Sequence, residues 1–143
     1  MSSQSDFQSM RDRFHPRCIA CSPNRPDGLR LSFAQTANGG VEAPLSCTQE
    51  LEGYPGVVHG GVLALVFDSA MANCMFSRGY RAVTAELTVR YLGPVSVGES
   101  AVVSVNVVRE AHPLYVLEGR VTQGGQEKAR ATGKFVAQAE EPG

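Results

Sequence analysis

The sequence lacks a surplus of charge of either sign. Thirteen Lys and Arg residues face fourteen Asp and Glu residues, so the formal net charge is −1. A protein that binds nucleic acid or an anionic membrane through its surface needs a large basic patch, because its affinity comes from phosphate contacts. We therefore expect neither nucleic acid nor a membrane as a partner.

Long apolar runs are also missing. The longest, at residues 62–67, is far shorter than the ~20 residues that cross a bilayer. Residues 1–14 interleave acidic and basic side chains and contain no apolar core of the kind found in signal peptides. We predict a cytoplasmic protein, in which the four cysteines stay free or bind a metal rather than form disulfides.

The length allows a single domain. For 143 residues, folding hides about 68% of the surface of the unfolded chain, which is enough for one hydrophobic core. We expect residues 1–143 to form one domain, in which residues 1–28 are an N-terminal arm and loop. The apolar content of 43% excludes a disordered chain.

The distribution of apolar, Gly and Pro residues divides the chain into elements. Residues 6–14 predict a short helix, and residues 15–28, rich in Pro and Gly, predict a loop. Gly60-Gly61 opens a run without Gly or Pro that predicts a four-turn helix, which ends at Arg78-Gly79. Strands are expected at residues 29–36, 41–47, 82–91, 101–110, 115–123 and 127–137.

The long helix is apolar on nearly every side, since only Asp68, Ser69 and Asn73 interrupt it. Such a helix is normally buried. In residues 82–91, apolar and polar side chains alternate with the period of a strand whose sheet is covered on one face. We predict an α+β fold, in which a curved antiparallel sheet of about six strands wraps around one long central helix.

Asp68 and the helix entrance hold the candidate reactive groups. An acid inside an apolar helix is costly unless it is paired or hydrogen-bonded, so Asp68 either caps a backbone group or is a carboxylate kept reactive in a cleft. At Gly60 the first unpaired N–H groups of the helix favour the negative charge of a carbonyl under attack, although Gly60-Gly61 could simply turn the chain. His59 could orient a substrate or cap the helix.

The spacing of these groups sets a constraint. Asp68 lies eight residues after Gly60, which is about 12 Å along a helix axis. One small substrate atom cannot contact both. The carboxylate must therefore act with donors from elsewhere, such as those of a second copy of the chain.

The segment HGGVLALVFDSAM, which begins at His59 and contains Asp68, resembles the HGG signature of the hot-dog acyl-CoA thioesterases of the PaaI-like family, named after the phenylacetate pathway. The likeness covers roughly residues 15–137. It also takes in five shorter segments, namely CIAC at residues 18–21, PDGL at 26–29, YPGVV at 54–58, VTAEL at 83–87 and RYLGPV at 90–95.

The resemblance implies a hot-dog fold and a homo-oligomer, with the dimer as the minimal active unit, often a tetramer, and active sites at the dimer interface. In such a site the N–H of Gly60 polarises the thioester carbonyl, and Asp68 of the opposite subunit activates water or attacks directly. The resemblance also implies that Thr84 holds the water, His59 orients the carbonyl and Gly61 helps to bind the substrate. Coenzyme A is part of the substrate, and no separate cofactor or metal is implied.

Three further features bear on this resemblance. Many family members carry an Asn six residues before the motif histidine as a second carbonyl donor, where this chain has Gly53.

Cys18 and Cys21 have C-x2-C spacing near His15, but one cysteine pair without a second pair favours ordinary loop thiols over a metal site. The candidates for binding the phosphates of coenzyme A are Arg78, Arg81, Arg90, Arg120, Lys128 and Arg130.

We therefore predict a homo-oligomeric acyl-CoA thioesterase that releases coenzyme A and a free acid. A hot-dog enoyl-CoA hydratase or dehydratase is an alternative with the same fold, although those families usually pair Asp and His differently. A non-catalytic module that binds acyl thioesters is the other alternative, and Gly53 in place of the donor motivates it.

Overall fold

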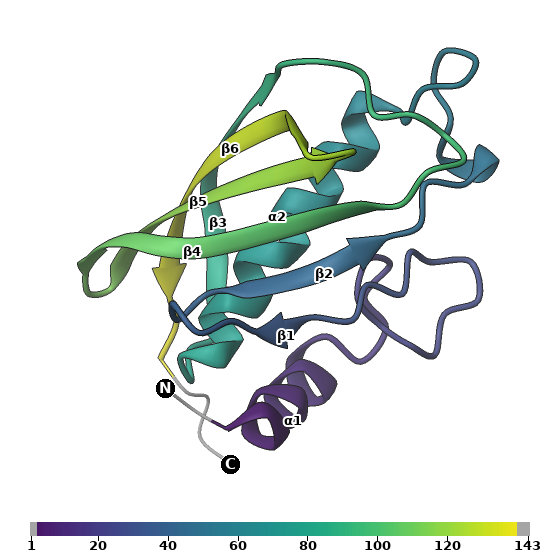
Figure 1. Ribbon diagram of the computed structural model, residues 1–143. Coiled ribbons are helices and arrows are strands. Elements are labelled where there is room, and N and C mark those ends of the chain that lie inside the picture. The colour runs from purple at the N-terminus through teal and green to yellow at the C-terminus, as the bar shows by residue number, and fades with distance from the viewer. Residues whose placement is uncertain (1–2, 140–143) are drawn as a thin grey trace.

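The computed structural model describes residues 3–139. One antiparallel sheet with the strand order β1-β2-β4-β5-β6-β3 curves around one long helix, α2 (Figure 1). The predicted α+β class and the sheet around a central helix are confirmed. The strands are β1 (Ala34–Gln35), β2 (Val41–Leu45), β3 (Ala82–Tyr91), β4 (Ala101–Ala111), β5 (Leu114–Gln123) and β6 (Gln126–Ala137). Residues 1, 2 and 140–143 of the predicted domain lie outside the described residues.

The central helix α2 (Gly60–Ser77) forms the middle of the core. Most of its side chains from Leu63 onward are buried, because the sheet and a second helix cover it. By length and composition α2 could cross a membrane, but 67% of it is buried inside the fold, and the core helix of a folded domain meets the same criteria. Its packing between protein elements accounts for the absence of a polar face.

The sheet lies very close to α2 at Gly133 of β6. A Cβ atom at this position would lie 2.3 Å from Sδ of Met71, so a larger residue would push the strand away from the helix. Phe67, Phe135 and Leu117 fill the space on either side of this contact and are fully buried. The central strands and α2 therefore form one continuous core.

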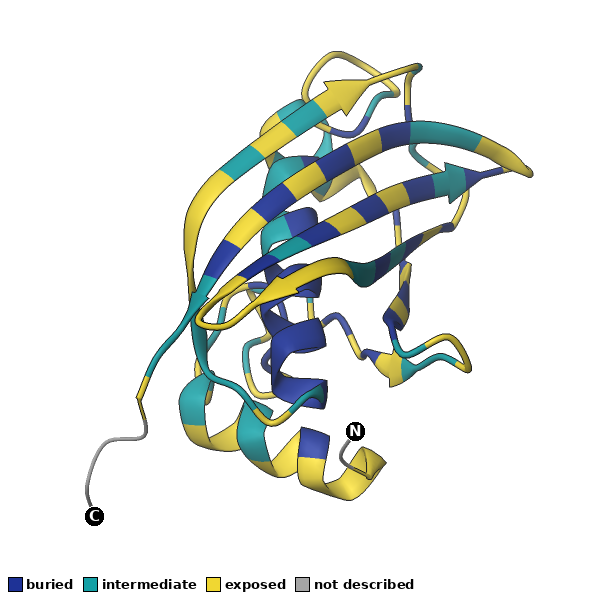
Figure 2. Ribbon diagram, turned by 90° about the vertical axis from the view of Figure 1, so that its left-hand side faces the viewer, coloured by how far each residue is buried: buried dark blue, intermediate teal, exposed yellow. Residues whose placement is uncertain are grey.

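The end strand β3 does not follow its sequence pattern. It pairs with β6 on one side and is the last strand in the sheet order. Leu87 and Val89 are half-buried, as the alternation predicts, whereas Val83 is 48% exposed and Ala85 is exposed. Inside the sheet, β5 has a buried side chain at every second position (Figure 2). The prediction of a covered face is thus wrong for the first half of β3.

The predicted strand at residues 29–36 is wrong over most of its length, since the two-residue β1 is the part that joins the sheet. The backbone N–H groups of Leu29 and Leu31 donate instead to the carbonyls of Ile19 and Ala20. This stretch is extended because it pairs with the preceding loop. The other predicted strands agree with β2 to β6 within two residues.

Two smaller elements complete the fold. Helix α1 (Gln4–Phe14) begins two residues earlier than predicted, because the Ser3 side chain caps it and accepts a hydrogen bond from the N–H of Asp6. A short 3-10 helix, η1 (Gln49–Leu51), precedes the turn that leads into α2. Helix α1 packs against α2 on the side that the sheet leaves open (Figure 1).

Candidate active site

His59 is the N-cap of α2. Its Nδ1 accepts a hydrogen bond of 2.8 Å from the N–H of Gly61, and its carbonyl accepts bonds from Val62 and Leu63. Capping was one of the two roles considered for this residue, and the structure shows it directly. The N–H of Gly61 is therefore occupied, and its part in substrate binding stays a prediction, as does the orienting role of His59.

The imidazole of His59 packs between two glycines. A Cβ atom at Gly61 would lie 3.1 Å from the ring, and one at Gly53 would lie 3.2 Å from Cα and Cδ2 of His59. The N–H of Gly53 donates to the carbonyl of Val57, which closes a tight turn beside the ring. Gly53 thus has a packing reason in this chain.

The N–H of Gly60 is a free donor at the start of the helix. No acceptor for it is found among residues 3–139, whereas the carbonyl of Gly60 accepts a hydrogen bond of 2.7 Å from the hydroxyl of Tyr91. The Tyr91 ring lies against Gly60, since a Cβ atom there would be 3.3 Å from Cζ. The positive end of the helix dipole adds to this donor, so the position favours an oxygen with negative charge.

A cleft of about 780 Å³ opens at this end of α2. Its lining comes from the segment 53–60, from Leu63 and from residues 91–95, and most of the lining side chains are apolar. Tyr54 is 84% exposed at the rim. The volume lies in the range of sites that bind small molecules or cofactors. The cleft therefore places the Gly60 N–H donor on a mostly apolar surface.

Asp68 and Thr84 form a second group of polar atoms. The Thr84 hydroxyl donates a hydrogen bond of 2.6 Å to Oδ1 of Asp68, which is half-buried on α2. The register between β3 and β6 shifts between Thr84 and Glu86, which marks a β-bulge. Bulges commonly re-aim a side chain next to an active site. Neither Asp68 nor Thr84 is among the residues that line the cleft, so one chain keeps this pair apart from the Gly60 donor.

The basic residues considered for binding the phosphates of coenzyme A lie in different surroundings in the structure. Lys128 lies next to the cleft, because its Nζ is 4.0 Å from the Cβ position of Gly93, a lining residue. Three others form ion pairs with glutamates of the sheet, namely Arg78, Arg120 and Arg130. The hydrogen bond from Arg130 lowers the pKa of its partner Glu127.

No cysteine is among the residues that line the cleft, and none of the four is in a disulfide, which agrees with the prediction that they stay free or bind a metal. A hydrogen bond from the Cys21 thiol lowers the pKa of Cys18, and the same bond together with burial raises the pKa of Cys21. Burial on α2 raises the pKa of Cys74 to about 11. The cleft lining thus contains no thiol.

Tyr91 is the site residue for which no role was predicted. It stands at the end of an alternating strand, and strand periodicity says nothing about which helix atom a tyrosine hydroxyl reaches. Its hydrogen bond to Gly60 joins β3 to the first turn of α2. Tyr91 therefore acts as a positioning residue for the free donor.

A sheet curved around one buried helix, with a cleft at the entrance of that helix, defines the hot-dog class of fold. The profile of the thioesterase superfamily matches residues 55–130, which is more than half of the chain. The chain belongs to the thioesterase superfamily. The predicted enzyme class, a thioester hydrolase, and the resemblance to PaaI-like proteins are thereby confirmed.

Individual relatives agree with this assignment. Human acyl-coenzyme A thioesterase 13 is 27% identical over 111 residues, which cover 76% of this chain and 75% of the relative. The solved structure of the E. coli PaaI protein, from the phenylacetic acid degradation operon, superposes with a TM-score of 0.78 at 18% identity, over 94% of this chain and 92% of that chain. These likenesses support the fold.

Two further solved structures are similar. A thioesterase superfamily protein gives a TM-score of 0.78 at 24% identity and covers 82% of this chain, but this chain covers 62% of that longer protein. A Streptococcus mutans protein, solved with acetyl CoA bound, gives a TM-score of 0.72 at 22% identity, over 78% of this chain and 91% of that chain.

Proposed function

We propose that the chain is an acyl-CoA thioesterase whose active site forms between two copies. One observation carries the proposal: the exposed end strand β3 has the Thr84–Asp68 pair at its beginning and the Tyr91–Gly60 pair at its end. The two reactive groups of one chain are too far apart to act together. A second copy in antiparallel orientation brings complementary ends next to each other.

The geometry of this pairing follows from the strand itself. If β3 pairs antiparallel with β3 of a second copy around a two-fold axis near Leu87 or Thr88, residue 84 of one copy lies near residue 91 of the other. Asp68 of one chain then lies near Gly60 of the other. The free edge and the exposed Val83 support such a pairing, because a long uncovered strand is a template for another strand.

The chemistry assigns one task to each group. The N–H of Gly60 stabilises the oxygen of the thioester carbonyl as negative charge develops on it. Asp68 of the opposite subunit takes a proton from water, or attacks the carbonyl carbon itself, and Thr84 holds the carboxylate and the water in place. The carbon–sulfur bond breaks, and the proton taken from water passes to the leaving sulfur, so coenzyme A leaves as a thiol beside the free acid. If Asp68 attacks directly, an acyl anhydride with Asp68 forms as the carbon–sulfur bond breaks, the leaving thiolate takes a proton from solvent, and water then hydrolyses the anhydride to the free acid and the aspartate.

The substrate class rests on the cleft and on the relatives. The cleft walls are apolar, which suits an acyl or pantetheine chain, and Lys128 at its rim suits a phosphate. The name of the human relative and the acetyl CoA in the Streptococcus mutans structure support coenzyme A as the carrier. Beyond coenzyme A as part of the substrate, we propose that the reaction needs no cofactor. We retain the cytoplasmic location as part of this proposal.

A thiol-release screen over aryl, short-chain and medium-chain acyl-CoAs tests the proposal. We expect Asp68→Asn to lower kcat/KM by about 10²–10⁴-fold with an unchanged unfolding midpoint, because it removes the carboxylate and keeps its shape. Asp27→Asn, at an exposed aspartate in an ion pair with Arg25, is the matched control and should retain full activity.

Three outcomes would contradict the proposal. Equal rates for Asp68→Asn and the parent would remove Asp68 from the mechanism. Loss of enoyl absorbance without thiol release would indicate a hydratase. Saturable binding of acyl-CoA without turnover would indicate a binding module.

A further inference from the structure

The loop at residues 15–28 is a tightly held structure that the thioesterase chemistry does not use. Ala20 and Ser22 are fully buried, which is unusual for a surface loop. The N–H of Ser22 donates to the carbonyl of Cys18, and the Ser22 hydroxyl donates to the carbonyl of Pro16. These bonds fix the backbone on both sides of the C-x2-C turn, so the two cysteine side chains are held in place.

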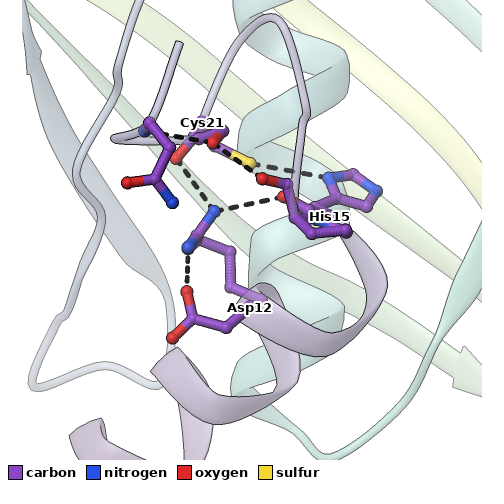
Figure 3. A network of polar contacts seen from close by, with 7 residues as sticks. Asp12, His15 and Cys21 are labelled. Carbon is purple, nitrogen blue, oxygen red and sulfur yellow. Dashed lines mark hydrogen bonds and ion pairs between the residues drawn. The ribbon is translucent and has the colours of Figure 1, made fainter.

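Three metal-binding atoms converge at this turn. One ligand atom each from His15, Cys18 and Cys21 lies within 4.8 Å of the other two. Figure 3 shows His15 and Cys21 facing each other, and Nδ1 of His15 is 3.5 Å from Sγ of Cys21. In a tetrahedral zinc site with Zn–S near 2.3 Å and Zn–N near 2.05 Å, the nitrogen and sulfur are about 3.5 Å apart. The observed separation, which is that of a hydrogen bond between the two side chains, also fits two ligands on one zinc ion.

The surroundings favour thiolates at this position. The N–H of Ala20 points at Sγ of Cys18, with a separation of 3.4 Å, and such backbone donors stabilise a sulfur anion. The guanidinium of Arg11 donates to the carbonyls of His15 and Cys21 and also forms an ion pair with Asp12, so it holds the backbone of the turn in place (Figure 3). Two thiolates and a neutral imidazole with Zn²⁺ give a site with no net charge.

The orientation of the third ligand is fixed by packing. The ring of His15 stands edge-on against Phe76 of α2, with centroids 5.0 Å apart. His15 is also the C-cap of α1, since its N–H donates to the carbonyl of Arg11. The ring is thus held by α1 on one side and by α2 on the other, and its Nδ1 faces the sulfurs.

Asn73 supplies an independent sign that a ligand is needed here. Its side chain is fully buried on α2, and within residues 3–139 its Oδ1 has no hydrogen-bond partner. Asn73 lines the same small cavity as Cys21, of about 280 Å³. A buried carbonyl oxygen without a donor is costly, and a water molecule on a metal ion would supply that donor.

We propose that His15, Cys18 and Cys21 bind one Zn²⁺ ion, with water in the fourth position. Thiolate and imidazole ligands with C-x2-C spacing select zinc over magnesium or calcium. Each thiol that binds the ion releases its proton to solvent. The ion joins the end of α1 to the C-x2-C turn, and its water reaches Asn73 of α2. None of the three ligands lines the cleft at Gly60, so we assign the ion a structural role.

Metal counting on the full untagged chain tests this proposal without any activity measurement. The chain is reduced, stripped with a chelator, and titrated with ZnCl₂. We expect one zinc ion per chain and a rise in Tm of roughly 5–10 °C at a hundredfold excess over Kd. Cobalt in place of zinc should give the visible bands of a tetrahedral, thiolate-bound ion.

Variants then assign the ligands. Cys18→Ser and Cys21→Ser should each bind less than about a tenth of an equivalent, and His15→Ala should weaken binding at least about tenfold. Cys47→Ala, at a buried cysteine outside the His15–Cys18–Cys21 cluster, should bind as the parent does. If the ligand variants fail to fold, the titration and the cobalt spectrum of the parent still decide. A reduced parent chain that takes up no zinc, or a cobalt spectrum without thiolate bands, would overturn the proposal.

Discussion

Strands β3 and β5 each have ten residues and belong to the same sheet, yet they have opposite environments. Along β5 every second side chain enters the core, and the strand has a neighbour on both sides. The first half of β3 is exposed, and its outer edge is free. Alternation in a sequence shows which side chains share a face, but it does not show that the same chain covers that face. The contrast separates a strand that stabilises the fold from a strand that is open to a partner.

The largest effect is expected on β5. Leu117→Ala deletes a fully buried side chain and should lower the free energy of unfolding by about 2–5 kcal/mol, because a cavity remains where the helix and sheet meet. Val83→Ala on β3 removes a side chain that is 48% exposed and should cost less than about 1 kcal/mol. Urea denaturation of both variants measures the difference, and equal losses would show that the two strands do not differ in this way.

Removal of the hydroxyl that β3 directs at Asp68 should affect catalysis and leave stability nearly unchanged. Thr84→Val keeps the shape and deletes the bond to the carboxylate. Because Thr84 is exposed, water can replace this bond without much loss of stability, but the carboxylate is no longer held in place, so kcat/KM should fall roughly tenfold to a hundredfold. Thr84→Ser retains a hydroxyl and should recover most of the rate. If Thr84→Ser loses as much activity as Thr84→Val, the hydroxyl is not the important group and Thr84 has a packing role instead.

The smallest effect concerns the free edge itself. Thr88→Lys places two like charges close together if two copies pair along β3, and the dimer dissociation constant should rise about fivefold to tenfold. Thr132→Lys is the matched control, because Thr132 is exposed and lies directly opposite Thr88 on β6. Light scattering at several protein concentrations measures the shift. A monomeric parent, or the same shift in both variants, would place the interface elsewhere.

The sequence predicts the central part of the fold well, because the signals there are local. The long helix has no Gly or Pro between residue 62 and its end, and β4, β5 and β6 are bounded by turns that contain Gly or Pro. The strand predicted at residues 29–36 fails for a physical reason. Its backbone donors pair with a loop ten residues earlier, and no periodicity records such a pairing.

The sequence identifies most of the residues of the candidate active site, but it does not predict the hydrogen bonds that connect them. The cost of an acid in an apolar helix identifies Asp68 as a candidate, and the helix entrance identifies Gly60. The bond from Thr84 to Asp68 depends on a bulge, and the bond from Tyr91 to Gly60 depends on where β3 crosses α2. Both depend on three-dimensional packing. The convergence of His15 with the cysteine pair likewise requires the end of α1 to fold back over the loop.

The packing of Gly53 against His59 limits what protein engineering can do with this enzyme. A designer who wished to give the cleft a second carbonyl donor would naturally write Gly53→Asn. The new Cβ would lie 3.2 Å from the backbone and ring of the histidine that caps α2, so this histidine must move by a few tenths of an ångström at the helix entrance from which the first donor projects. The two donors are therefore coupled through His59, and a variant that adds the second must be checked for its effect on the first.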